Sequence, residues 1–85
     1  MKNIPEGWEH IDNALRKNFV FRDFNEALEV IMKIGFEAEY LNHHPEWTNI
    51  YNKLSIKLTT HDAGNTVTAK DIELAKRINI LSKQT

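Results

Sequence analysis

Three of the four histidines in this 85-residue sequence stand at positions where a side chain could transfer protons. His43 and His44 are adjacent and directly precede Pro45, while His61 follows a segment in which apolar and polar residues alternate. An imidazole ring has an ordinary pKa of about 6.5, so its acid and base forms are both available at neutral pH. Because the ends of helices and strands present positioned, exposed side chains, these histidines predict a general acid–base site.

Glu39 stands four residues before His43, a spacing that puts both side chains on one face of a helix. A carboxylate there can accept one ring N–H, fix the tautomer of the imidazole and make its other nitrogen more basic. The pattern therefore predicts that Glu39 orients His43. The same spacing is also typical of an ordinary surface pair, so both roles stay open.

Each candidate residue also has a simple structural interpretation. Paired histidines before a proline are typical of a solvated helix end, and His61 could be a polar strand terminus. Asp71 stands three residues after Thr68, where its carboxylate can complete a helix N-cap. Trp47 and Tyr51 are more often packing residues than residues that stack on a ligand. These interpretations stay open beside the functional ones.

A metal site is a rival use of the same side chains. Neutral imidazoles together with Glu39 or Asp71 could hold zinc. The spacings match no familiar zinc signature, and the sequence contains no cysteine, which removes thiolate ligands, disulfides and a cysteine nucleophile together. We therefore expect no metal.

Composition and charge narrow the class of protein. The length fits a single domain spanning residues 1–85, small enough that self-association is expected. The 11 Lys and Arg residues are balanced by 12 Asp and Glu residues, so no basic excess favours direct nucleic-acid binding. No secretory signal and no apolar run of about 20 residues is visible. We expect a cytoplasmic protein without a membrane segment, with the nucleus as the alternative location.

The first third of the sequence predicts a short hairpin. Residues 8–10 form a candidate strand, Ile11, Asp12 and Asn13 a turn, and residues 15–21 a second strand that ends in aromatic and β-branched residues.

The segment from Phe24 to Asn42 is the clearest helix. Asp23 is a suitable N-cap, and Glu26 can complete a capping box. Apolar residues cover an arc of roughly 200°, more than packing against a sheet requires. This width indicates either a second contact surface, such as a subunit interface, or a helix sunk deeper in its own core.

Pro45 ends this helix, because the residue before a proline is pushed out of the α region. Residues 51–61 then alternate, which predicts a strand with one buried face formed by Leu54, Ile56 and Leu58.

Residues 62–67 form a loop, and Thr68 caps a final helix whose inner stripe is Ile72, Ala75, Ile78 and Leu81. Two helices would thus cover one face of a small antiparallel sheet of about four strands. This arrangement defines an α+β class.

Taken together, these residues resemble the signature of the pterin-4a-carbinolamine dehydratases. That signature contains an acid, three further residues, His-His-Pro, an aromatic residue six positions after the proline, a histidine ten positions further on, and an aspartate in the next helix. The sequence matches it at Glu39, His43, His44, Pro45, Tyr51, His61 and Asp71.

The resemblance extends from about Gly7 and Trp8 to the last helix, with two departures. Many relatives begin with a further helix ahead of the Gly-Trp pair, for which this sequence has no residues. The loop between His61 and the helix of Asp71 also looks slightly longer than in animal relatives. The longer loop could change the role of Asp71 and the shape of the pocket wall that the loop forms.

Members of this family dehydrate the 4a-carbinolamine that aromatic amino acid hydroxylases release, giving quinonoid dihydropterin in the recycling of tetrahydrobiopterin. They use no metal or organic cofactor. The resemblance implies that His43 and His61 act as acids, that His44 binds the substrate and serves as a base toward N5, and that Glu39 and Asp71 support them. It implies a substrate-binding set of Asn42, Pro45, Trp47, Thr59, Thr60 and Asp62, with Trp8 as a further wall.

The resemblance also implies partners. The family forms homodimers and homotetramers, and helix 24–41 is the candidate interface. Animal members bind a homeodomain transcription factor, the hepatocyte nuclear factor, as its dimerisation cofactor. A non-catalytic regulatory module that binds a helical partner is therefore the main alternative function.

Overall fold

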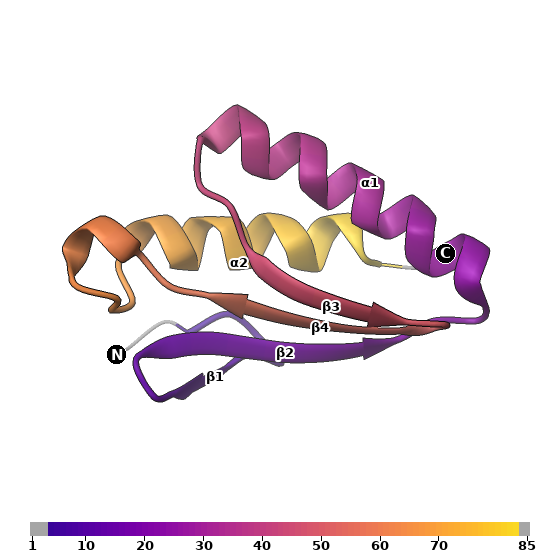
Figure 1. Cartoon of the computed structure of the whole chain (residues 1–85), viewed down its shortest axis with the longest axis horizontal. Coiled ribbons are helices and arrows are strands. Elements are labelled where there is room, and N and C mark those ends of the chain that lie inside the picture. Colours follow the sequence, from indigo (N-terminus) through magenta and orange to yellow (C-terminus); the bar gives the residue numbers. More distant parts are fainter. Residues whose placement is uncertain (1–3, 84–85) are drawn as a thin grey trace.

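A computed structural model describes residues 4–83 as one antiparallel sheet covered by two helices. The strands are β1 (Glu9–Ile11), β2 (Ala14–Val20), β3 (Glu46–Ile50) and β4 (Lys53–Leu58), in the order β1-β2-β4-β3. The helices are α1 (Phe24–Leu41) and α2 (Ala69–Leu81), with the short 3-10 helix η1 (His61–Ala63) before α2. Both helices lie on the same side of the sheet (Figure 1). The predicted α+β class is confirmed.

The predicted N-terminal hairpin is present. Asp12 and Asn13 form its two-residue turn with φ of 52° and 63°, the left-handed conformation that tight hairpin turns require. Asp and Asn are the non-glycine residues that adopt this conformation most readily. The first strand includes Ile11, which the sequence assigned to the turn.

The sequence assigned no element to residues 46–50, yet they form the edge strand β3. Trp47 pairs with Ile56 and packs against the core. Its ring lies 3.8 Å from the position that a Cβ on Gly35 would occupy, so Trp47 lies against α1 at this point of the helix. Tyr51, with φ of 52°, begins the turn from β3 to β4, which makes β4 shorter than the strand predicted over 51–61.

The core lies between the inner face of the sheet and the two helices. Leu54, Ile56 and Leu58 of β4 are all buried, as the alternation predicted. In α2, Ala75 and Ile78 of the predicted stripe are buried, and Leu74, which the stripe omitted, is fully buried as well. The other large side chains that are fully buried are Leu15, Ile34 and Asp71.

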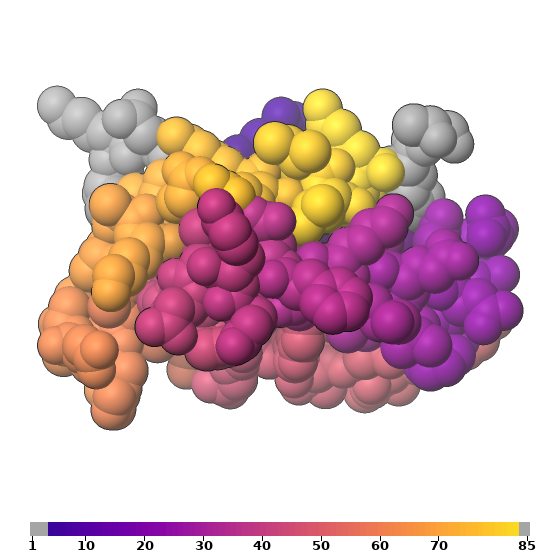
Figure 2. All heavy atoms as spheres, turned by 90° about the horizontal axis from the view of Figure 1, so that it is seen from above, coloured from indigo at the N-terminus to yellow at the C-terminus, as the bar shows by residue number. Residues whose placement is uncertain are grey.

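An apolar row on α1 stays exposed. Phe24, Leu28, Met32, Phe36 and Tyr40 follow one another at four-residue spacing and are 43%, 40%, 54%, 73% and 80% exposed. The alternative of a helix sunk deeper in its own core is therefore wrong for this row. Figure 2 looks onto the helical face, where α1 lies beside α2. Within residues 4–83, neither helix is long and apolar enough to cross a membrane.

Candidate functional site

The C-terminal end of α1 sets the position of His43. Asn42 adopts the left-handed conformation with φ of 53°, and its N–H donates to the carbonyl of Glu39 at 3.0 Å. The N–H of His43 reaches the carbonyl of Ala38, also at 3.0 Å. These two bonds form a Schellman motif, which turns the chain away from the helix axis. Asn42, predicted to bind substrate, thus also has a structural role as the C-cap.

Asp71 lies in the first turn of α2 and is completely buried. Its Oδ2 accepts the backbone N–H of Thr68 at 2.9 Å, and Thr68 caps the helix in return, so the predicted capping box is confirmed. The same oxygen accepts the hydroxyl of Thr60 at 2.7 Å. A buried carboxylate needs such donors, because leaving it unpaired would be strongly unfavourable.

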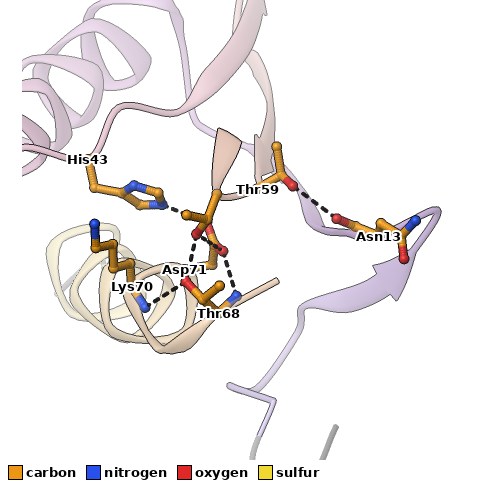
Figure 3. Close-up of polar contacts among 7 residues, drawn as sticks. Asn13, His43, Thr59, Thr68, Lys70 and Asp71 are labelled. Carbon is orange, nitrogen blue, oxygen red and sulfur yellow. Dashed lines mark hydrogen bonds and ion pairs between the residues drawn. The ribbon is translucent and has the colours of Figure 1, made fainter. Parts of the chain in front are cut away.

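The remaining oxygen of Asp71 contacts a candidate histidine. Nε2 of His43 lies 2.6 Å from Asp71 Oδ1, and the two side chains are 11% and 0% exposed (Figure 3). The prediction that Glu39 orients His43 is therefore wrong. Glu39 contacts Nε2 of His44 instead, at 2.8 Å, with both side chains mostly exposed. The Schellman motif explains why Glu39 contacts His44 and not His43, because His43 no longer follows the helical spacing from Glu39.

His61 begins η1 and is exposed. Its Nδ1 lies 3.0 Å from the side-chain oxygen of Asn65, an acceptor, so this nitrogen is the donor in the contact. Asp62 is exposed beside it, whereas the preceding Thr60 is buried. The hydroxyl of Thr59 donates to the carbonyl of Asn13 at 3.0 Å, which ties this segment to the β1–β2 turn (Figure 3).

The two tryptophans occupy packing positions, whereas Tyr51 is 63% exposed. Trp8 is buried, and its Nε1 donates to the side-chain oxygen of Asn79 at 2.9 Å, so it belongs to the core. Lys17 donates to the same oxygen at 2.8 Å, and burial lowers the pKa of its amine below the ordinary value.

Tyr51 lies at the β3–β4 turn, at the end of β4 opposite to His61. Pro45 is half-buried between His44 and β3.

Two cavities bear on the candidate site. A pocket of about 270 Å³ is lined by Leu41, His43, Ala69, Lys70 and Glu73, so His43 faces an open space with apolar walls. A larger cavity of about 400 Å³ is lined by residues of all four strands. It includes Trp47 but none of the three candidate histidines.

The described part of the chain, residues 4–83, brings no three His, Asp or Glu side chains together as metal ligands. The arrangement instead pairs an imidazole with a buried carboxylate, as in general acid–base sites. The sequence did not assign the side chain of Thr60 its role beneath Asp71. The only signal was its place next to His61 and opposite the Thr68 cap.

Comparisons with known proteins identify the family of this chain. The sequence profile of the family described as Pterin 4 alpha carbinolamine dehydratase matches residues 1–81. A relative from Opitutus terrae is 49% identical over 91% of this chain and 79% of its own length. One from Bradyrhizobium diazoefficiens is 46% identical over 96% and 82%. Both are provisionally named pterin-4-alpha-carbinolamine dehydratases.

Two solved structures share the fold. The transcriptional coactivator/pterin dehydratase from Brucella melitensis is 38% identical, with a TM-score of 0.87 over 92% of this chain and 84% of that chain. A pterin dehydratase-like protein identified as a RuBisCO assembly factor in the alpha-carboxysome has a TM-score of 0.74 over 92% and 89%, but only 15% identity, so it supports the fold alone. The profile match over nearly the whole chain, together with relatives of this identity, shows that the chain belongs to the pterin-4a-carbinolamine dehydratase family.

Proposed function

We propose that this protein dehydrates 4a-hydroxytetrahydrobiopterin, the pterin-4a-carbinolamine, by histidine general acid–base catalysis in the recycling of tetrahydrobiopterin. The observation that carries the proposal is the 2.6 Å contact between His43 and the buried carboxylate of Asp71. A carboxylate in this position orients the ring and stabilises the imidazolium form, which lets the ring gain and lose a proton in place. The family match supplies the substrate class.

The reaction breaks one bond and moves two protons. The C4a–O bond breaks as the hydroxyl takes a proton from an imidazolium and leaves as water. A base takes the proton from N5, and the N–H electron pair forms the new C4a=N5 double bond. We propose that His43 and His61 act as acids toward the hydroxyl, and that His44 is the base toward N5. General acid–base assistance of this kind contributes on the order of 10²–10⁴-fold.

Some of the predicted substrate-binding residues are proposed to contact the pterin, and others to support the site from within the fold. Asn42, Thr59 and Asp62 border the candidate histidines in the chain, and we propose that they contact the edge of the pterin. Pro45 holds the paired histidines between α1 and β3. Thr60 and Trp47 support the site from within the fold, since Thr60 is buried and Trp47 packs against the core.

The test is the change in ultraviolet absorbance as synthetic 4a-hydroxytetrahydropterin dehydrates, with and without the protein and in the presence of a chelator. We expect acceleration that falls by about 10²–10⁴-fold in His43→Ala and in His61→Ala. His43→Gln separates loss of proton transfer from loss of the fold. Its amide can still reach Asp71 but cannot exchange protons as an imidazole does. His10→Ala, which removes an exposed histidine in β1, should retain activity. Folded protein without acceleration would refute the proposal.

A second candidate function rests on the exposed apolar row of α1. We propose that this row packs against a second copy of the chain in a homodimer or homotetramer, in the cytoplasm. The alternative is a non-catalytic module whose α1 row binds a helical partner such as a transcription factor, and the name of the Brucella structure includes the word coactivator. Capture of such a partner by protein that lacks dehydratase activity would favour the alternative.

A further inference from the structure

The hydrogen bonds beside Asp71 run in one direction. Oδ2 accepts the hydroxyl of Thr60 at 2.7 Å. A hydroxyl carries a single proton, so Thr60 cannot also donate to Thr68. In the 2.6 Å contact between the two threonine oxygens, Thr68 is therefore the donor. The Thr68 oxygen in turn accepts the backbone N–H of Lys70 at 3.3 Å (Figure 3). The chain of donors begins at a backbone amide and ends at the carboxylate.

Hydrogen-bond donors to one oxygen favour the ionised form of a carboxylate, and that form decides which group carries the proton at its other oxygen. Two donors already occupy Oδ2 of Asp71, and an ionised carboxylate has only acceptor sites to offer. The proton in the 2.6 Å contact with Oδ1 therefore belongs to Nε2 of His43. A neutral imidazole has one N–H, so Nδ1 keeps the lone pair.

We propose that the Thr60 hydroxyl, acting through Asp71, holds neutral His43 in the Nε2–H tautomer and leaves Nδ1 as the nitrogen that exchanges protons. Thr60 is thus a positioning residue, and its place in the reaction rests on the proposed function of His43. Proton transfer through Nδ1 leaves the bond to Asp71 in place during turnover. The ring can then change its charge without changing its orientation.

The other groups of Thr60 exclude a direct role toward substrate. The residue is 6% exposed, and its backbone N–H donates to the carbonyl of Thr66 at 2.9 Å. Its carbonyl accepts the N–H of Ala63 at 3.2 Å and that of Asn65 at 3.1 Å. The adjacent Thr59 is a matched control for the tautomer, because its hydroxyl donates to Asn13 instead of Asp71.

The tautomer can be measured without turnover. Ring nitrogen shifts of ¹⁵N-labelled protein distinguish a protonated nitrogen from one with a lone pair. They are followed upward in pH until the His43 signals stop changing, so that the neutral ring is the form observed. The His43 signals are identified by their loss in His43→Gln. We expect Nε2 protonated and Nδ1 unprotonated in the wild-type protein. The opposite tautomer, or an even mixture, would overturn the inference.

Variants test the part played by Thr60. Thr60→Val should produce a mixture of His43 tautomers and lower kcat by about 10–100-fold, the loss that corresponds to one hydrogen bond to a charged group. Thr60→Ser should restore both the wild-type tautomer and kcat. Thr59→Val should keep the wild-type tautomer. An unchanged tautomer in folded Thr60→Val would refute the role of Thr60. If the wild-type protein shows the expected tautomer but does not accelerate dehydration, the proposed function fails and the tautomer assignment stands.

Discussion

At the scale of single residues, the two adjacent histidines differ in what holds them. His43 is 11% exposed and pairs with a buried carboxylate, whereas His44 and its partner Glu39 are 59% and 78% exposed. An exposed pair contributes about 0–1 kcal/mol to stability, while a hydrogen bond to a buried charged group contributes about 1.5–3 kcal/mol. We therefore expect Asp71 to contribute more to the stability of the site than Glu39 does.

We accordingly expect Asp71→Asn and Glu39→Gln to differ in both stability and rate. An amide cannot accept hydrogen bonds from His43, Thr60 and Thr68 at once, so Asp71→Asn should lower the free energy of unfolding by about 1–3 kcal/mol and slow dehydration. Glu39→Gln should change the free energy of unfolding by less than about 1 kcal/mol. Urea unfolding and the dehydration assay, applied to both variants, measure the contrast. Equal losses in the two variants would show that the exposed pair matters as much as the buried one.

The sequence located the candidate histidines but paired one of them wrongly. The i, i+4 rule that joined Glu39 to His43 holds only while the helix continues. Asn42 leaves the helical conformation, and nothing in the local pattern shows that the next side chain will meet a residue 28 positions away. Asp71 was predicted as a capping residue and, from the resemblance, as a residue that supports the histidines, but which histidine it contacts depends on the packing of α1 beside α2.

At the scale of elements, the start of α1 depends on a charged cap. The backbone N–H of Glu26 donates to Asp23 Oδ1 at 2.9 Å and, together with the Arg22 side chain, holds the pKa of the Asp23 carboxyl below its ordinary value of 3.8. Glu26 reaches the backbone N–H of Arg22 at 2.6 Å, one residue before the N-cap, so the capping box predicted there is not formed as expected.

This cap predicts a pH dependence of stability. Because the folded state lowers the pKa of Asp23, its ionised form adds stability above the unfolded value of 3.8, and this increment is lost as pH falls through the lower folded value. Asp23→Asn keeps an oxygen that can cap the helix but does not titrate. The stability difference between wild type and Asp23→Asn, followed by thermal unfolding from neutral pH to about pH 2, should shrink below about pH 4. A difference that stays constant with pH would contradict this role.

Elements with strong local signals were predictable, and the short edge strand was not. Helix ends were predictable because local residues mark them. The N-cap side chains of Asp23 and Thr68 mark helix starts, and Pro45 marks the end of α1. Strand β3 has five residues, and its pattern is completed only by pairing with β4. From the sequence, Trp47 could be either a ligand contact or a packing residue, and the structure shows that it packs against the core.

At the scale of the whole molecule, the exposed apolar row takes no part in the contacts that hold the site together. The residues that hold the site together come from a single chain: His43 from the segment after α1, Asp71 from α2, and Thr60 from the segment after β4. The apolar row runs along α1 and is left uncovered by the chain's own core. Activity and assembly should therefore be separable.

We expect the wild-type protein to be a homo-oligomer, and Phe36→Glu to convert it to a monomer that still dehydrates the substrate. Phe36 is 73% exposed, so a charge there costs nothing in the free chain but would be buried without a partner in an interface. Light scattering after size-exclusion chromatography gives the mass, and the absorbance assay gives the activity. Val20→Glu, which replaces an apolar residue 69% exposed at the end of β2, is the control and should leave the mass unchanged. A monomeric wild type would refute the proposed self-interface. Loss of activity in a folded monomer would mean that a second copy completes the site.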